Sequence, residues 1–63
     1  MKRRDFVRHL RQHGCKLLRE GARHAVYWNP ATGARAAVPR HTEIAKGTAR
    51  RICEVLDLPS PLE

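Results

Sequence analysis

Hydrophobic positions recur at helical spacing near the start of the chain. Phe6, Val7 and Leu10 form one narrow apolar stripe among polar residues, which predicts a helix over residues 3–13. Gly14 follows at the position where a helix commonly ends in the left-handed conformation. The first element is therefore expected to be an amphipathic helix with one face to bury.

A second helical stripe lies near the other end of the chain and predicts a helix that starts near residue 47. Its apolar members are Ala49, Ile52, Cys53 and Leu56. Arg50 and Arg51 point away from this stripe, and Glu54 is close enough in sequence to pair with either of them. Pro59 and Pro61 cannot continue a helix.

Between the helices, three short segments are predicted to be strands: residues 15–20, 23–29 and 35–38. Turn residues separate them, at Gly21-Ala22 and again over residues 29–33.

Alternation along the middle strand places His24, Val26 and Trp28 on one face, with Ala25 and Tyr27 on the other. Pro39 ends the third strand.

The element order is therefore helix, three strands, helix. A three-stranded antiparallel sheet has one face to bury, and each helix has one apolar stripe, so the simplest packing puts both helices on the same face. The expected fold is α+β with the α-β-β-β-α layout of double-stranded-RNA-binding domains. Residues 1–58 are expected to form the domain and residues 59–63 a flexible tail.

The charge balance points to a polyanionic partner. The 63 residues carry 13 Lys and Arg against 6 Asp and Glu, a net charge of +7, as is typical of nucleic-acid-binding domains. A chain of this length buries only about 60% of its surface, which favours a shallow site for a polymer over a deep pocket. Without a secretory signal or a long apolar run, a cytoplasmic protein that crosses no membrane is expected.

Two cysteines, Cys15 and Cys53, fall at positions that are expected to be buried, and reduced thiols fit a cytoplasmic protein. A disulfide between them is the alternative. His9 and His13 lie four residues apart on the first helix, and with Cys15 they could hold zinc if one more ligand were present. A solvated helix face, with His13 just before the terminal glycine, is the preferred interpretation of these histidines, and no metal or other cofactor is predicted.

His24 is the leading candidate for chemistry, because it follows a glycine turn at the rim of a strand and imidazole transfers protons near neutral pH. Lys16, Arg23 and Arg40 are the candidates for contacts to phosphate. His41 could be a second catalytic group or could order the connector to the second helix.

An aromatic side chain on the middle strand could also serve RNA binding, by stacking on an unpaired base. Tyr27 is predicted to be the stacking residue, with Trp28 as the alternative. At least one of the two is expected to belong to the core.

In their order and spacing, several short segments resemble the HicA family of bacterial toxins, and the resemblance covers roughly residues 2–58. The matching segments are Lys2-Arg3-Arg4-Asp5, His13-Gly14-Cys15, Gly21-Ala22-Arg23-His24, Asn29-Pro30, Val38-Pro39-Arg40-His41 and Glu43-Ile44-Ala45-Lys46-Gly47-Thr48. The Val-Pro-Arg-His stretch, followed by Lys-Gly-Thr and a helix, is the most specific.

The resemblance implies a small toxin that cleaves messenger RNA without a metal, using a single histidine in a Gly-x-x-His segment, here His24. Arg23 stands where many members have a small residue. The resemblance also implies neutralisation by a HicB-type antitoxin, and the toxin alone is expected to be a monomer.

A non-catalytic RNA-binding module, or a toxin whose catalysis has decayed, is the alternative function. A small DNA-binding domain is disfavoured because the strands separate the two helices, so that no helix-turn-helix pair is present.

Overall fold

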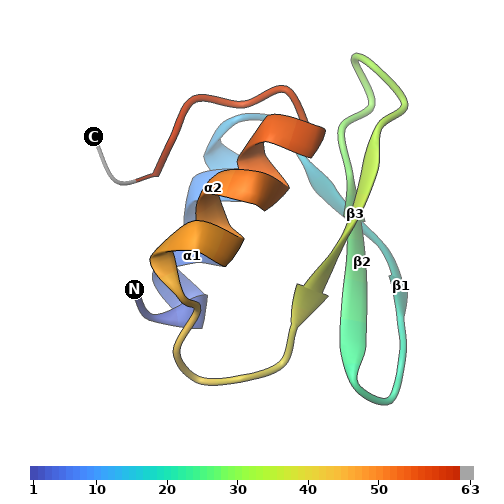
Figure 1. Ribbon diagram of the computed structural model, residues 1–63. Helices are drawn as coiled ribbons and strands as arrows, with labels where there is room; N and C mark the ends of the chain where they lie inside the picture. The colour runs from blue at the N-terminus through green and yellow to red at the C-terminus, as the bar shows by residue number, and fades with distance from the viewer. Residues whose placement is uncertain (62–63) are drawn as a thin grey trace.

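The computed structural model describes residues 1–61, and its elements follow the predicted order of helix, three strands and helix. They are α1 (Arg3–Gln12), β1 (Lys16–Glu20), β2 (His24–Trp28), β3 (Arg35–Pro39) and α2 (Lys46–Val55). The strands form one antiparallel sheet in the order β1-β2-β3, and both helices lie on the same side of it (Figure 1). The predicted α-β-β-β-α arrangement is confirmed.

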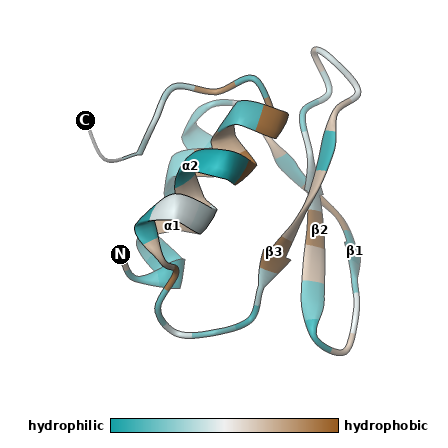
Figure 2. Ribbon diagram, viewed as in Figure 1, coloured by the Kyte–Doolittle hydropathy of each residue, from teal (hydrophilic) through white to brown (hydrophobic). Residues whose placement is uncertain are grey.

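The core lies between the helices and one face of the sheet. Its buried residues are Phe6, Leu10, Cys15, Ala25, Tyr27, Val38, Ile44, Ala49, Ile52, Cys53 and Leu56. The whole stripe predicted for the second helix is included, and so are Phe6 and Leu10 of the first, whereas Val7 is only partly buried against the core. Figure 2 shows apolar bands on β2, β3 and α2. The other face of the sheet therefore carries no helix.

Both helices end in the same hydrogen-bonded motif. In α1, the amide of Gly14 donates to the carbonyl of Arg11 and the amide of Cys15 to that of Leu10, each at 3.0 Å. Gly14 has a φ of 87°, so the predicted glycine stop is confirmed.

In α2, the amide of Leu58 donates to Cys53 at 2.8 Å and that of Asp57 to Glu54 at 3.2 Å. Here the left-handed position is held by Asp57, with a φ of 58°, and not by a glycine. Within residues 1–61, Glu54 forms no ion pair with Arg50 or Arg51.

A β-bulge interrupts the pairing of β1 with β2. Leu17 lies opposite Tyr27, but the next aligned pair is Arg19 with Val26, so Leu18 is an extra residue. Beyond the bulge, Arg19 lies on the face of the sheet that lacks helices and Glu20 on the opposite face.

The hairpin loop between β2 and β3 is tied to the end of α2 by a buried amide. The side chain of Asn29 donates to the carbonyl of Leu56 at 2.7 Å and accepts from the amide of Ala31 at 3.0 Å. Its own carbonyl accepts from the amide of Gly33, which has a left-handed φ of 79° that glycine adopts without strain. Asn29 thereby joins the hairpin to the helix layer.

The connector from β3 to α2 is held against the start of α1. Arg3 donates through its side chain to the carbonyl of Pro39 at 2.8 Å and through its amide to that of Thr42 at 2.8 Å. Ile44 is buried in the core. The segment that carries His41 is therefore fastened at several points.

None of the helices in residues 1–61 is both long enough and apolar enough to cross a membrane. Cys15 and Cys53 are both buried and free, as predicted. The carbonyl of Pro59 lies 2.9 Å from Nε2 of His9. Residues 62–63 of the predicted tail lie outside the described residues, and the flexibility of that tail stays a prediction.

Candidate functional site

His24 begins β2 immediately after the turn that leaves β1. The amide of Gly21 donates to the backbone carbonyl of His24 at 2.8 Å, which closes the turn. A Cβ atom at position 21 would lie 2.8 Å from that same oxygen, closer than real Cβ contacts allow. Glycine is therefore needed here because the backbone of His24 passes so near, and the bend itself falls on Ala22 and Arg23.

Two arginines and two histidines surround a shallow hollow at this end of the molecule. It is lined by Arg23, His24, Arg40 and His41. Both histidine side chains are exposed, and within residues 1–61 no hydrogen bond or ion pair occupies either ring. Both rings are therefore open to a ligand that enters the hollow.

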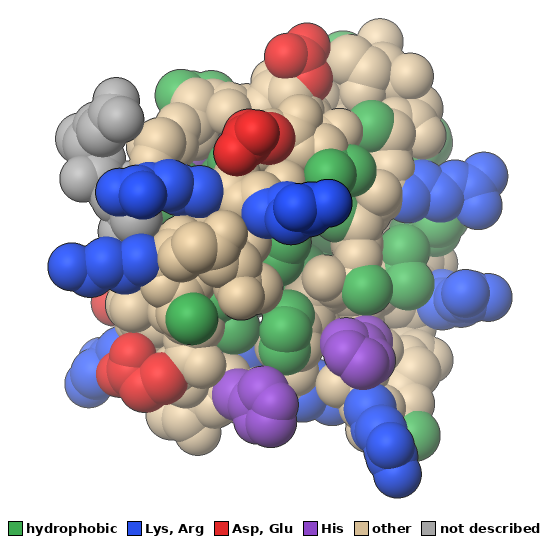
Figure 3. Space-filling view, in the orientation of Figure 1, with side chains coloured by type: hydrophobic (Ala, Val, Ile, Leu, Met, Phe, Trp, Pro, Cys, Tyr) green, Lys and Arg blue, Asp and Glu red, His purple; other side chains and the backbone are tan. Residues whose placement is uncertain are grey.

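A second hollow lies on the other side of His24, toward the face of the sheet that lacks helices. Its lining includes Arg19, Glu20, Arg23, His24, Val26 and Ala37. The bulge in β1 brings Arg19 to this face, so His24 stands between two hollows that both contain arginines. Figure 3 shows Lys and Arg side chains projecting from the sheet side of the molecule as well as from the helix side.

Arg40 connects the two segments that carry the histidines. Its Nε donates to the carbonyl of Gly21 at 3.0 Å, and its Nη2 lies 3.0 Å from Oε2 of Glu20. The guanidinium thus joins the β3–α2 connector to the β1–β2 turn. Arg40 lies beside His24 as predicted, but part of its hydrogen-bonding capacity is already used within the protein.

The predicted phosphate contacts divide into two groups. Arg23 and Arg40 line the hollow with His24. Lys16 lies at the far end of β1, opposite Trp28, and lines neither hollow beside His24. Arg19 is a cation near His24 that the sequence analysis missed, because only the bulge places it there.

Tyr27 does not fit the role predicted for it. Its side chain is 4% exposed, belongs to the core, and has the guanidinium of Arg11 at 5.9 Å from its ring centre. No ring face is open for a base. The expectation that at least one of the two aromatics belongs to the core is confirmed, and Trp28 is the residue left on the open face.

The histidines of α1 lie apart from this site. The ring centres of His9 and His13 are 4.6 Å apart, and His9 contacts Pro59. Residues 1–61 contain no group of three His, Cys, Asp or Glu side chains placed to hold a metal ion, so the zinc alternative has no third ligand there.

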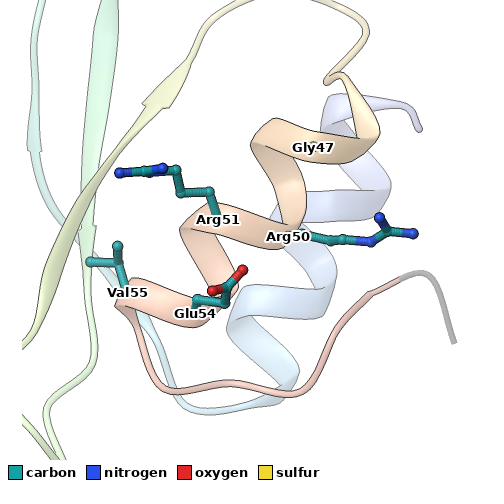
Figure 4. Close-up of a pocket in the computed structure, with 5 residues that line it drawn as sticks. All are labelled: Gly47, Arg50, Arg51, Glu54 and Val55. Carbon is teal, nitrogen blue, oxygen red and sulfur yellow. The ribbon is translucent and has the colours of Figure 1, made fainter.

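A third hollow lies on the exposed surface of α2 (Figure 4). Its lining residues are Gly47, Arg50, Arg51, Glu54 and Val55. Figure 4 shows Arg50 and Arg51 pointing to opposite sides of the helix, with Arg51 and Val55 on the side nearer the sheet. No histidine belongs to this lining, so unlike the hollows beside His24 it offers no proton-transfer group.

The fold and the site define a small basic α+β domain with a solvent-open histidine among arginines. The sequence profile of a family described as HicA toxin of bacterial toxin–antitoxin systems matches residues 3–58. The match covers most of the chain, and the chain belongs to this family of toxins. No curated protein and no solved structure is similar enough to count as a match.

Proposed function

We propose that this toxin is an endoribonuclease that cuts messenger RNA with His24 as the proton-transfer group and without a metal ion. The observation that carries the proposal is an exposed histidine, free of partners in the described part of the chain, in a hollow lined by arginines. Membership of a toxin family supports the biological role.

RNA supplies its own nucleophile, so the protein needs only to move protons and stabilise charge. His24 takes the proton of the ribose 2′-hydroxyl, whose oxygen forms a bond to phosphorus while the bond from phosphorus to the 5′ oxygen breaks. The products carry a 2′,3′-cyclic phosphate and a 5′-hydroxyl. Arg23 stabilises the negative charge on the phosphate oxygens during this step.

The leaving 5′ oxygen also needs a proton, and His41 is the candidate that supplies it. It lines the same hollow as His24, and Arg40 fastens its connector to the turn that carries His24. General acid–base catalysis of this kind contributes typically about 10²–10⁴-fold.

The partner that silences the toxin is proposed to be a HicB-type antitoxin with an acidic surface that covers the hollow. Charge complementarity would make its association fast and sensitive to salt. The messenger RNA substrate places the active toxin, proposed to be a monomer, in the cytoplasm.

The test is incubation of a long single-stranded RNA with the protein in excess chelator, followed by analysis of fragments and their ends. We expect wild-type protein to produce cyclic-phosphate ends and His24→Ala to lose about 10²-fold or more of the rate while still binding RNA. His13→Ala is the matched control, because it removes an exposed histidine outside the hollow and should cut normally.

A second variant tests the role of His41. His41→Ala should lower the rate of fragment formation while RNA binding survives, because the leaving 5′ oxygen then lacks its proton donor. If the wild type binds RNA but yields no fragments, the protein is a non-catalytic RNA-binding module.

A further inference from the structure

We propose that the face of the sheet without helices is a platform for single-stranded RNA, on which an unpaired base stacks against Trp28. The inference deepens the proposed ribonuclease function, since it specifies the form of the substrate. The sheet face without helices leads into the site at His24.

The strand register sets the composition of this face. Trp28 lies opposite Lys16 on one side and Arg35 on the other. The next row consists of Arg19, Val26 and Ala37, and His24 with Pro39 ends the face. An aromatic and aliphatic strip thus runs along the middle of the sheet, with cations beside it.

Trp28 is available for a ligand. Its side chain is half-buried, but neither Trp28 nor Val26 is part of the core or packs against it. The core lies on the opposite face, which carries both helices (Figure 1). In the part of the chain that the structure describes, no helix covers the indole ring.

The charge of this face favours a polyanion. Lys16, Arg19 and Arg35 face outward. Among the strand residues the only carboxylate is that of Glu20, which lies at the edge of this face in the hollow beside His24 and pairs with Arg40. Acidic side chains of a protein could neutralise these cations, but they have no ring to place on Trp28. A nucleic acid strand supplies phosphates for the cations and bases for the indole.

The platform selects an unpaired strand. A base inside a duplex is stacked and paired, so its flat face cannot reach a side chain, whereas single-stranded bases stack readily on aromatic rings. Trp28 lies four residues along β2 from His24, about 13 Å at the usual rise of a strand. A stacked base would therefore lie a few nucleotides from the bond that is cut.

Trp28 is the chain's one tryptophan, so its fluorescence reports directly on the proposed contact. The ligand is a short 2′-O-methyl RNA, which lacks the nucleophilic hydroxyl and cannot be cleaved whatever the role of His24. We expect the single strand to quench the fluorescence and the same strand annealed to its complement to leave it nearly unchanged.

Substitutions of Trp28 measure how much its ring contributes to RNA binding. Trp28→Ala should weaken binding of the single strand roughly 5- to 100-fold and raise the KM for cleavage more than it lowers kcat. Trp28→Phe should recover most of the affinity because it keeps an aromatic face. Val55→Ala is the matched control, an exposed apolar residue on α2 whose loss should change nothing.

Three outcomes would overturn the platform: no quenching by the single strand, equal quenching by the duplex, or unchanged affinity in a Trp28→Ala protein that melts as the wild type does. Failure of the ribonuclease proposal is seen separately, as absence of fragments from unmodified RNA. Quenching with no cleavage leaves the platform intact on a protein that binds without cutting.

Discussion

At the scale of single residues, Gly21 decides where the catalytic candidate lies. The sequence predicted a glycine turn before His24. The structure gives the reason for a glycine at position 21, since the space beside it is filled by the carbonyl of His24 and no positive φ is involved. Such a close approach depends on how two strands meet, which no local pattern in the sequence reveals.

Gly21→Ala is therefore expected to displace the backbone of His24 and to lower RNA cleavage by about 10- to 100-fold while the fold survives. The rate of fragment formation measures this, with circular dichroism as the check on folding. Gly47→Ala is the control, because nothing lies within 4 Å of a Cβ there and the activity should be unchanged. Equal cleavage rates for the two variants would show that the close contact between position 21 and the carbonyl of His24 does not affect activity.

The burial of the two aromatic residues of β2 was only partly predictable from the sequence. Alternation correctly separated Tyr27 from Trp28, and it predicted that at least one would be buried. Which face the helices cover depends on long-range packing, so the stacking role was predicted for Tyr27, whose ring is buried in the core, whereas the ring on the open face is that of Trp28.

At the scale of elements, the bulge in β1 redistributes charge. Strict alternation from Lys16 would place Glu20 on the open face and Arg19 toward the helices. The extra residue reverses both, so that the cation joins the side of His24 and the carboxylate reaches Arg40. Bulges leave little trace in composition, which is why Arg19 was not among the predicted site residues.

The end of α2 yields a prediction about stability. Asp57 holds a left-handed conformation that suits glycine, and its negative charge lies at the end of the helix where the dipole is also negative. Asp57→Gly is expected to stabilise the protein by about 0.5–1 kcal/mol, which raises Tm by several degrees in a domain of this size.

Asp57→Asn separates the two causes, because it removes the charge and keeps a side chain. Thermal melts of the three proteins distinguish them: a gain shared by both variants points to charge, and a gain in the glycine variant alone points to the backbone. A lower Tm for Asp57→Gly would show that the aspartate is favourable where it stands.

At the scale of the whole molecule, the fold was largely predictable because two helical stripes and three turn-bounded strands leave few ways to bury apolar surface in 63 residues. Stripe residues such as Leu10 and Ile52 are buried as expected. The convergence of His41 and Arg40 on the turn at His24 was not predictable, because it depends on a connector held by distant contacts.

The buried thiols make stability depend on pH. Burial raises the pKa of both Cys15 and Cys53 above the ordinary thiol value of 9.0, and for Cys53 the neighbouring Cys15 adds to the effect. Below 9.0 both the folded and the unfolded chain keep these protons, so the thiols contribute no pH dependence there. Above it the unfolded chain ionises first, and stability falls as the pH rises.

Urea unfolding at neutral pH and at about one unit above the ordinary thiol pKa should reveal this loss. The double variant Cys15→Ala with Cys53→Ala is expected to be less stable than the wild type at both pH values. Its stability should fall less than that of the wild type between the two pH values, because only groups other than these thiols then change their protonation. An equal loss of stability in both proteins would show that groups other than the two thiols cause the pH dependence.

The interrupted ladder of β1 has a further consequence, for self-association. β1 is an outer strand of the sheet, and Leu17 and Leu18 are 38% and 41% exposed along it. A regular outer strand with exposed leucines invites edge-to-edge pairing with another copy and then aggregation. Because Leu18 breaks the hydrogen-bonding repeat in the middle of the strand, we expect an incoming strand to find no continuous row of partners along β1, which disfavours polymerisation through this edge of the sheet.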